Sequence, residues 1–236
     1  DSKLLLDILE NISTSVVVLN DDNSYYFINI AGLNLLGISN KFPDLATLKP
    51  CLGHLSLEQH IKAVDDANTA FQTWKETTAK ERSVILKKWG ELITENAHDL
   101  AKIMTIEQGK PLAEAKGEIL MGASYIEFYA EEAKRVYGDI VPDPRPGKRI
   151  VIIKQPVGVV GAITPWNFPN SMITRKCAAA LAVGCTTVVK PASQTPYSAL
   201  AVAVLAKEAG FPDGVFNVIT GSASEIGKEL TSNPIV

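Results

Sequence analysis

The sequence has few cysteines, few histidines and little excess charge of either sign. Its 236 residues include three cysteines and three histidines, and the formal net charge is −3. The cysteines, Cys51, Cys177 and Cys185, are irregularly spaced and odd in number, which argues against a disulfide framework and against a zinc site. The histidines show no metal-ligand spacing either. We therefore expect a protein without a metal centre, located in the reducing cytoplasm.

The sequence also lacks a strongly basic segment and a long hydrophobic run. Its 23 basic and 26 acidic residues are spread along the chain, which offers no surface for nucleic acid or for an anionic membrane. The apolar run over residues 178–189 is too short to span a bilayer, and the first residues do not form a signal peptide. These absences favour a soluble protein that binds a small molecule and neither nucleic acid nor membrane.

A long central part of the chain has the apolar spacing of helices. Capping-box patterns, Ser56 with Gln59 and Thr78 with Glu81, predict helices that begin at residues 56 and 78. Further helices are predicted over residues 97–106 and 112–137. The stretch that follows, 138–147, is rich in proline and glycine and predicts a loop or an edge hairpin leading into a strand at 149–154.

After residue 156 the pattern changes to short, β-branched apolar runs. These runs predict strands at 157–163, 186–189 and 215–219, separated by helices at about 171–182 and 197–209. Strands that alternate with helices pair in parallel and are covered on both faces. The sequence therefore predicts an α/β fold with a Rossmann-like parallel sheet flanked by helices.

The first 50 residues have a different pattern of predicted elements. They predict a helix at 3–12, strands at 14–19 and 24–30 around a turn at 20–23, and a short helix at 31–36. Two strands are too few to form a stable sheet of their own.

Polar residues follow two of the predicted strands, at the edge where ligands bind in open parallel sheets. Asn167 either donates its amide to a developing oxyanion or closes its own turn, and spacing alone leaves both interpretations open. Lys190 is either a cation for a ribose or phosphate or an ordinary solvated charge. Ser193 and Thr195 are polar loop residues or helix caps, with capping favoured for Thr195.

Other candidates lie in helical segments. Arg175 either clamps a carboxylate or extends its charge to solvent from a helix surface. Gly221 opens a turn into a helix whose free N–H groups suit a phosphate, although no G-x-G-x-x-G pattern and no P-loop occurs. Cys177 and Cys185 are interpreted as small core residues.

Several of these stretches together resemble the aldehyde dehydrogenase family. In chain order they are Thr78-Ala-Lys-Glu-Arg82, Glu107-Gln-Gly-Lys-Pro-Leu-Ala-Glu-Ala-Lys-Gly117, Ile153-Lys-Gln-Pro-Val-Gly158, Thr164-Pro-Trp-Asn-Phe-Pro169, Ile173-Thr-Arg-Lys176, Lys190-Pro-Ala-Ser-Gln-Thr-Pro196 and Gly214-Val-Phe-Asn-Val218. Residues 54–236 are similar to the N-terminal half of this family, and most of all to its succinate-semialdehyde dehydrogenase branch.

This resemblance implies an oxidoreductase that converts succinate semialdehyde to succinate with NADP, or with NAD as the second choice. It implies that Asn167 serves the oxyanion, that Arg175 binds the substrate carboxylate, and that Ser193 favours NADP where NAD-preferring relatives often carry a glutamate. It further implies a homo-oligomer for the intact family. The cofactor-binding set that it implies is Thr164, Pro165, Trp166, Asn167, Lys190, Pro191, Ala192, Ser193 and Gly221.

The resemblance is incomplete in two ways. The family's Gly-Ser-Thr turn, its Glu-Leu-Gly-Gly general-base segment and its cysteine nucleophile lie beyond the point that matches Val236, so we expect a truncated chain without turnover of its own. Residues 4–41 instead resemble the start of a PAS sensor domain of a nitrogen-regulation histidine kinase, through Ile12-Ser-Thr-Ser-Val-Val-Val-Leu-Asn-Asp-Asp22. We therefore expect a join near residues 49–53, between a PAS-like segment, 1–52, and a dehydrogenase region, 53–236. The alternative function is a sensory or interaction fusion protein without catalysis.

Overall fold

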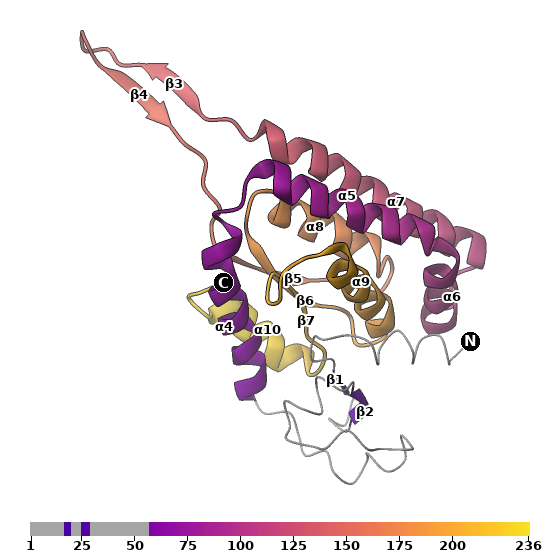
Figure 1. Cartoon of the computed structure of the whole chain (residues 1–236). Helices are drawn as coiled ribbons and strands as arrows, with labels where there is room; N and C mark the ends of the chain where they lie inside the picture. The colour runs from indigo at the N-terminus through magenta and orange to yellow at the C-terminus, as the bar shows by residue number, and fades with distance from the viewer. Residues whose placement is uncertain (1–16, 20–24, 29–56) are drawn as a thin grey trace.

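The computed structural model describes residues 17–19, 25–28 and 57–236, with side chains from residue 61 onward. Within these residues, a layer of helices packs against a small parallel sheet, and a hairpin projects away from both (Figure 1). The helices of the first layer are α4 (Leu57–Trp74), α5 (Ala79–Glu95), α6 (Ala97–Gln108) and α7 (Leu112–Glu132).

The helices predicted after residue 56 are present in the described residues, with one main difference at the end of α7. The capping box at the start of α5 is confirmed, because the Thr78 hydroxyl accepts from the Glu81 N–H at 3.2 Å and the Glu81 carboxylate accepts from the Thr78 N–H at 2.7 Å. The prediction that the last helix continues to residue 137 is wrong: α7 ends at Glu132, and a short 3₁₀ turn, η1 (Ala133–Arg135), follows. Val136 and Tyr137 continue the apolar pattern of the helix but are 43% and 67% exposed. Their side chains therefore bury too little surface to stabilise a longer helix.

A tight corner joins α6 to α7. Gly109 ends α6 in the left-handed conformation, with φ of 83°, which a residue with a side chain rarely adopts. Pro111 then precedes the first residue of α7, so Lys110 alone lies between the two breakers.

The second half forms the predicted parallel sheet. Its strands are β5 (Val159–Ile163), β6 (Thr186–Lys190) and β7 (Phe216–Val218), in the order β5-β6-β7, and its helices are α8 (Ser171–Ala182), α9 (Pro196–Ala209) and α10 (Ala223–Ser232). Both faces are covered. Val189 belongs to the large apolar core with α5, α7, α8 and α9, whereas its neighbour Val188 points into a smaller core with α4 and α10.

Trp89 of α5 links the helical layer to α9. It is fully buried, its indole N–H donates to the Val202 carbonyl at 3.1 Å, and its ring meets that of Phe211 edge-on at 5.6 Å. Because the buried indole N–H has a partner, this large ring adds apolar burial without an unsatisfied donor.

Two antiparallel hairpins complete the described structure. β3 (Asp139–Pro142) pairs with β4 (Arg149–Ile152), so of the two predicted alternatives, a loop or an edge hairpin, the structure shows the hairpin. Every residue of both strands is exposed, and the pair extends away from the helices (Figure 1). β1 (Val17–Leu19) pairs with β2 (Tyr25–Ile28), as expected for the two strands predicted near the N-terminus. The helices predicted at 3–12 and 31–36, and the rest of the PAS-like segment, lie outside the described residues. In the described part of the chain no helix is both long enough and apolar enough to cross a membrane.

Candidate active site

The two polar turns singled out in the sequence leave the same edge of the sheet. Ile163 and Lys190 are register partners at the ends of β5 and β6. The Thr164 N–H donates to the Lys190 carbonyl at 3.1 Å, so the parallel ladder continues one residue into the first turn. Ile219 in turn donates to the Val189 carbonyl at 2.8 Å, which brings the chain after β7 to the same edge. The fold therefore brings the Thr164, Lys190 and Gly221 segments together.

The first turn exposes Pro165, Trp166 and Asn167, whereas Thr164 at its start is buried. Residues of another part of the chain hold the backbone of the turn. The Asn167 carbonyl accepts from Gln108 Nε2 at 3.2 Å and from Lys110 Nζ at 2.9 Å. The Asn167 side-chain amide makes no hydrogen bond to any described residue, so the interpretation in which it closes its own turn is not what the structure shows. An anchored backbone with an unengaged amide is the arrangement that an oxyanion donor needs.

The helix after this turn is capped by a carboxylate from another element. Asn170 occupies the N-cap position of α8, but its side chain makes no capping bond. Instead Glu118 of α7, 3% exposed, accepts from the backbone N–H groups of Asn170 at 3.0 Å and Ser171 at 3.2 Å. Glu118 also forms an ion pair with Lys110. A buried carboxylate at a helix N-terminus offsets free N–H groups and suits the helix dipole.

The second turn folds around a buried lysine. Lys190 is 3% exposed, which differs from the solvated-charge interpretation. Its ammonium donates to the Pro191 carbonyl at 2.6 Å and to the Ser193 hydroxyl at 3.4 Å, and burial lowers its pKa. Pro191 is buried, Ala192 half-buried and Ser193 exposed. Lys190 forms no ion pair with a described carboxylate, so an anionic ligand would neutralise its charge.

The predicted cap of α9 is right in position and wrong in mechanism. Thr195 is the N-cap residue, yet its hydroxyl is buried and makes no hydrogen bond to the described residues. Glu107 of α6 supplies the cap, because its carboxylate accepts from the N–H groups of Tyr197 and Ser198. Burial raises the pKa of Glu107 to about 7, while hydrogen bonds from Ser198 and Tyr197 oppose that rise.

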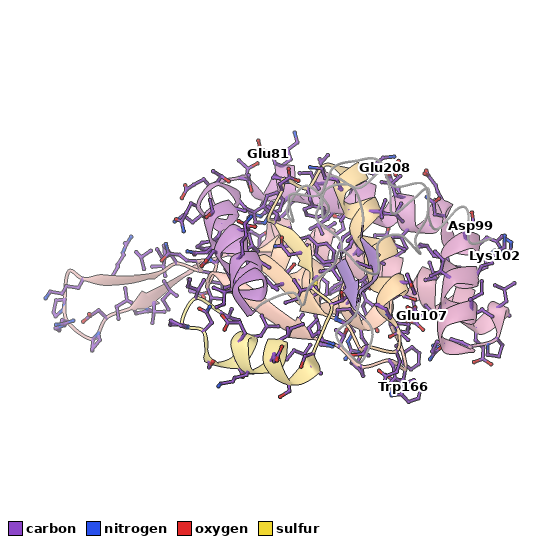
Figure 2. All side chains as sticks on the ribbon, turned by 90° about the horizontal axis from the view of Figure 1, so that it is seen from below. Glu81, Asp99, Lys102, Glu107, Trp166 and Glu208 are labelled. Carbon is purple, nitrogen blue, oxygen red and sulfur yellow. The ribbon has the colours of Figure 1, made fainter. Side chains whose placement is uncertain are left out.

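Glu107 lies on the same side of the molecule as Trp166, opposite Glu208 at the far end of α9 (Figure 2). Glu107, Lys110 and Glu118 received no role from the sequence, although they fall within or just after the stretch 107–117 that resembles a known family. Their partners in the two turns are 52 to 91 residues away, so no local pattern indicated their roles.

The remaining candidates are placed as follows. Arg175 is exposed on α8, and its guanidinium makes no hydrogen bond or ion pair with the described residues. The Arg175 guanidinium is therefore free to bind a ligand from solvent. Gly221, with φ of 137°, directly precedes Ser222, whose hydroxyl caps α10 by accepting from the Glu225 N–H at 3.4 Å.

The two described cysteines are core residues, as predicted. Cys177 and Cys185 are 1% and 2% exposed, and burial raises the pKa of the Cys177 thiol to about 12. Cys51 lies outside the described residues. No cluster of three or more metal-ligating side chains occurs among the residues with described positions, and His98 is exposed on α6.

Comparisons with known proteins show the family to which the chain belongs. The sequence pattern of the aldehyde dehydrogenase family matches residues 52–236. A glutarate-semialdehyde dehydrogenase of Pseudomonas aeruginosa is 63% identical over 175 residues, covering 74% of this chain and 36% of the relative. The NADP-dependent succinate-semialdehyde dehydrogenase GabD of Escherichia coli is 63% identical over 174 residues, with the same two shares.

A solved structure shows the same fold. The succinate-semialdehyde dehydrogenase of Burkholderia pseudomallei superposes with a TM-score of 0.77 at 46% identity, covering 94% of this chain and 42% of that protein. The chain therefore spans about a third of the length of the curated relatives that it matches.

Proposed function

Because the chain belongs to the aldehyde dehydrogenase family, we propose that its described residues form the nucleotide- and substrate-binding turns of an NADP-dependent succinate-semialdehyde dehydrogenase. The observation that carries the proposal is the buried ammonium of Lys190, which has no carboxylate partner among the described residues and lies 3.4 Å from the Ser193 hydroxyl after the end of β6. A cation and a hydroxyl donor at a strand end match the needs of a phosphorylated ribose.

NADP, when bound, accepts the hydride that the aldehyde loses on oxidation. In this proposal Lys190 and Ser193 bind the ribose and its phosphate, and Trp166 and the backbone of the first turn line the cofactor. The two turns take their shape from Thr164, Pro165, Pro191 and Ala192. In the third segment at the sheet edge, Gly221 has no side chain and so lets the cofactor approach the backbone closely. NADP is preferred because Ser193 places no carboxylate where a 2′-phosphate would be repelled.

Asn167 belongs to the cofactor-binding turn and also acts on the substrate. Its amide donates to the carbonyl oxygen as negative charge develops there, which lowers the barrier because the donor is already oriented. Arg175 binds the terminal carboxylate of succinate semialdehyde through charge-assisted hydrogen bonds. Relatives named for succinate and glutarate semialdehydes support this assignment, since both substrates carry such a carboxylate.

The described residues do not provide a nucleophile for the covalent step. Thiolate, not thiol, attacks a carbonyl, and the Cys177 thiol is buried with its pKa raised to about 12. Cys185 is equally buried. We therefore propose that these residues bind and orient the reactants and that this chain has no turnover by itself.

The proposal also includes a boundary between two segments near residues 49–53. It further includes a cytoplasmic location and a homo-oligomeric state for the protein. The family match begins at residue 52, which supports a dehydrogenase unit over 53–236 and a separate segment over 1–52. The alternative, a sensory or interaction fusion, depends on the PAS-like segment, and no observation on the described residues favours it.

Calorimetric titration of the purified chain with NADP and with NAD tests the proposal. We expect NADP to bind more tightly than NAD, and Lys190→Met to weaken NADP binding at least tenfold, about 1.4 kcal/mol. Lys207→Met is the matched control, because Lys207 is an α9 lysine paired with Asp213 at the surface. The proposal fails if the unmodified chain binds neither nucleotide, or if both lysine variants bind NADP equally well.

A further inference from the structure

The corner between α6 and α7 places one lysine behind the Asn167 turn. Lys110 has 11% of its side chain exposed, and its ammonium donates to the Asn167 carbonyl at 2.9 Å. The same ammonium pairs with Glu118, whose side chain is 1% exposed. It also lies 4.2 Å from the centre of the Phe168 ring.

These contacts engage two of the three ammonium donors and direct the charge toward one short segment. A lysine ammonium has three donors. One meets Glu118, one meets the Asn167 carbonyl, and the charge faces the ring of Phe168 at a distance typical of cation–π attraction. Lys110 therefore contacts two consecutive residues of the turn, through the backbone of one and the side chain of the other.

Glu118 holds the other end of the same segment. Its Oε2 accepts a hydrogen bond from the Lys110 ammonium, while its Oε1 accepts hydrogen bonds from the backbone N–H groups of Asn170 and Ser171. The residues between Asn167 and Ser171 are thus fixed at both ends by one ion pair. Removing one partner of a buried ion pair leaves the other charge buried and uncompensated. Replacing either Lys110 or Glu118 by a neutral residue should therefore loosen the segment.

We infer that Lys110 and Glu118 are a positioning pair that fixes the direction of the Asn167 side chain through its backbone. The Asn167 amide has no partner of its own among the described residues, so its orientation depends on the carbonyl that Lys110 holds. A preorganised donor is worth more to a transition state than a mobile one. The catalytic consequence rests on the proposed role of Asn167, whereas the ordering of the turn does not.

Fluorine NMR on the 236-residue chain tests the inference without any activity measurement. The chain has three tryptophans, of which Trp74 and Trp89 are buried and Trp166 is exposed next to Asn167. In protein labelled with 5-fluorotryptophan, Lys110→Met is expected to shift and broaden the Trp166 resonance and to leave the other two unchanged. Trp166→Phe assigns the resonance.

Lys102→Met is the matched control, because Lys102 is an exposed α6 lysine paired with Asp99, away from Trp166 (Figure 2). It is expected to leave all three resonances unchanged. An unchanged Trp166 resonance in folded Lys110→Met protein would overturn the inference. The NMR result does not depend on nucleotide binding. The inference about Lys110 and the proposed function can therefore be contradicted independently of each other.

A double-mutant cycle separates a positioning pair from two independent contacts. Glu118→Gln is expected to displace the Trp166 resonance as Lys110→Met does, and the double variant to match either single one. Additive displacements would show that the two residues act separately. If the variants do not fold, hydrogen exchange on the unmodified chain decides: the N–H groups of Asn170 and Ser171 should be protected at least tenfold over an open loop, and unprotected exchange would contradict the inference.

Discussion

Glu107 accepts two hydrogen bonds from Ser198, one from the backbone N–H at 3.0 Å and one from the hydroxyl at 2.6 Å, although 91 residues separate them. This contact ties the start of α9 to the end of α6. Because α9 begins directly after the Lys190 turn, the position of that turn depends on α6 as well as on the sheet.

The first prediction concerns pH. Burial raises the pKa of Glu107 from its ordinary 4.5 to about 7, so the folded chain binds this proton more tightly than the unfolded chain. The stability contributed by this group is therefore complete below about pH 4.5 and is lost as the pH rises through 7, a change on the order of 3 kcal/mol. Urea unfolding between pH 4.5 and 8 should show this decline for the unmodified chain relative to Glu107→Gln.

The control for this experiment is Glu208→Gln, at the exposed far end of α9 (Figure 2). It should keep the pH dependence of the unmodified chain. A parallel decline in Glu107→Gln and in the unmodified chain would mean that Glu107 does not titrate in this range.

The second prediction concerns the contact between α7 and α8. A Cβ at Gly122 would lie 2.2 Å from the Asn170 side-chain oxygen and 3.0 Å from the Thr174 hydroxyl. Gly122→Ala should therefore displace the Asn170 side chain, which is 1% exposed and has little room to move, and cost about 1–3 kcal/mol of stability, measured by urea unfolding. Gly117→Ala on the same helix meets nothing within 4 Å and should be neutral or stabilise by up to about 1 kcal/mol. Equal effects of the two substitutions would rule out this account of the packing.

The third prediction concerns cofactor choice. In an active full-length enzyme that carries this segment, Ser193→Glu should reduce kcat/KM for NADP more than tenfold and spare or improve NAD use. The added carboxylate would repel a 2′-phosphate, at a cost above about 1.4 kcal/mol. Ser232→Glu, on the exposed last turn of α10, should leave the NADP/NAD ratio unchanged. An unchanged ratio in Ser193→Glu would reduce Ser193 to an ordinary turn residue.

The fourth prediction concerns the substrate carboxylate. In the same full-length enzyme, Arg175→Ala should raise the barrier for succinate semialdehyde by about 2–4 kcal/mol, because a charge-assisted pair is lost. An uncharged aldehyde of similar length should be affected little. Steady-state kinetics with both aldehydes provide the measurement, and equal losses would indicate a structural role for Arg175.

The fifth prediction concerns turnover. The 236-residue chain, incubated with succinate semialdehyde and NADP, should give no absorbance of reduced nicotinamide, because its described thiols are buried. Turnover that persists after removal of contaminating enzymes would require an accessible nucleophile that we have not identified.

Local patterns in the sequence were enough to predict most of the elements. The capping box of Thr78 and Glu81 marked the start of α5, and the alternation of apolar runs with helices predicted β5, β6, β7 and the bounds of α8. Strand ends then pointed to Asn167 and Lys190, because ligands in parallel sheets bind at that edge. These features depend on neighbours within a few residues or on a general rule of topology.

The supports of the site were not predictable in the same way. Glu107, Lys110 and Glu118 look like ordinary helix or turn residues, and their importance comes from partners that only the folded chain brings near. Thr195 shows the converse: its position suggested a side-chain cap, but the carboxylate of Glu107 already occupies the N–H groups of α9. The end of α7 was misplaced because an apolar pattern does not show whether anything packs against it.

The long separation of these contacts also bears on the order of folding. The bonds from α6 and α7 to the two turns close loops of 52 to 91 residues, whereas the neighbouring helices contact one another over much shorter stretches. Closing long loops costs chain entropy before any contact forms, so such contacts form late. The helical layer is thus expected to form first, and a refolding chain should regain its helical circular dichroism signal before it regains nucleotide binding.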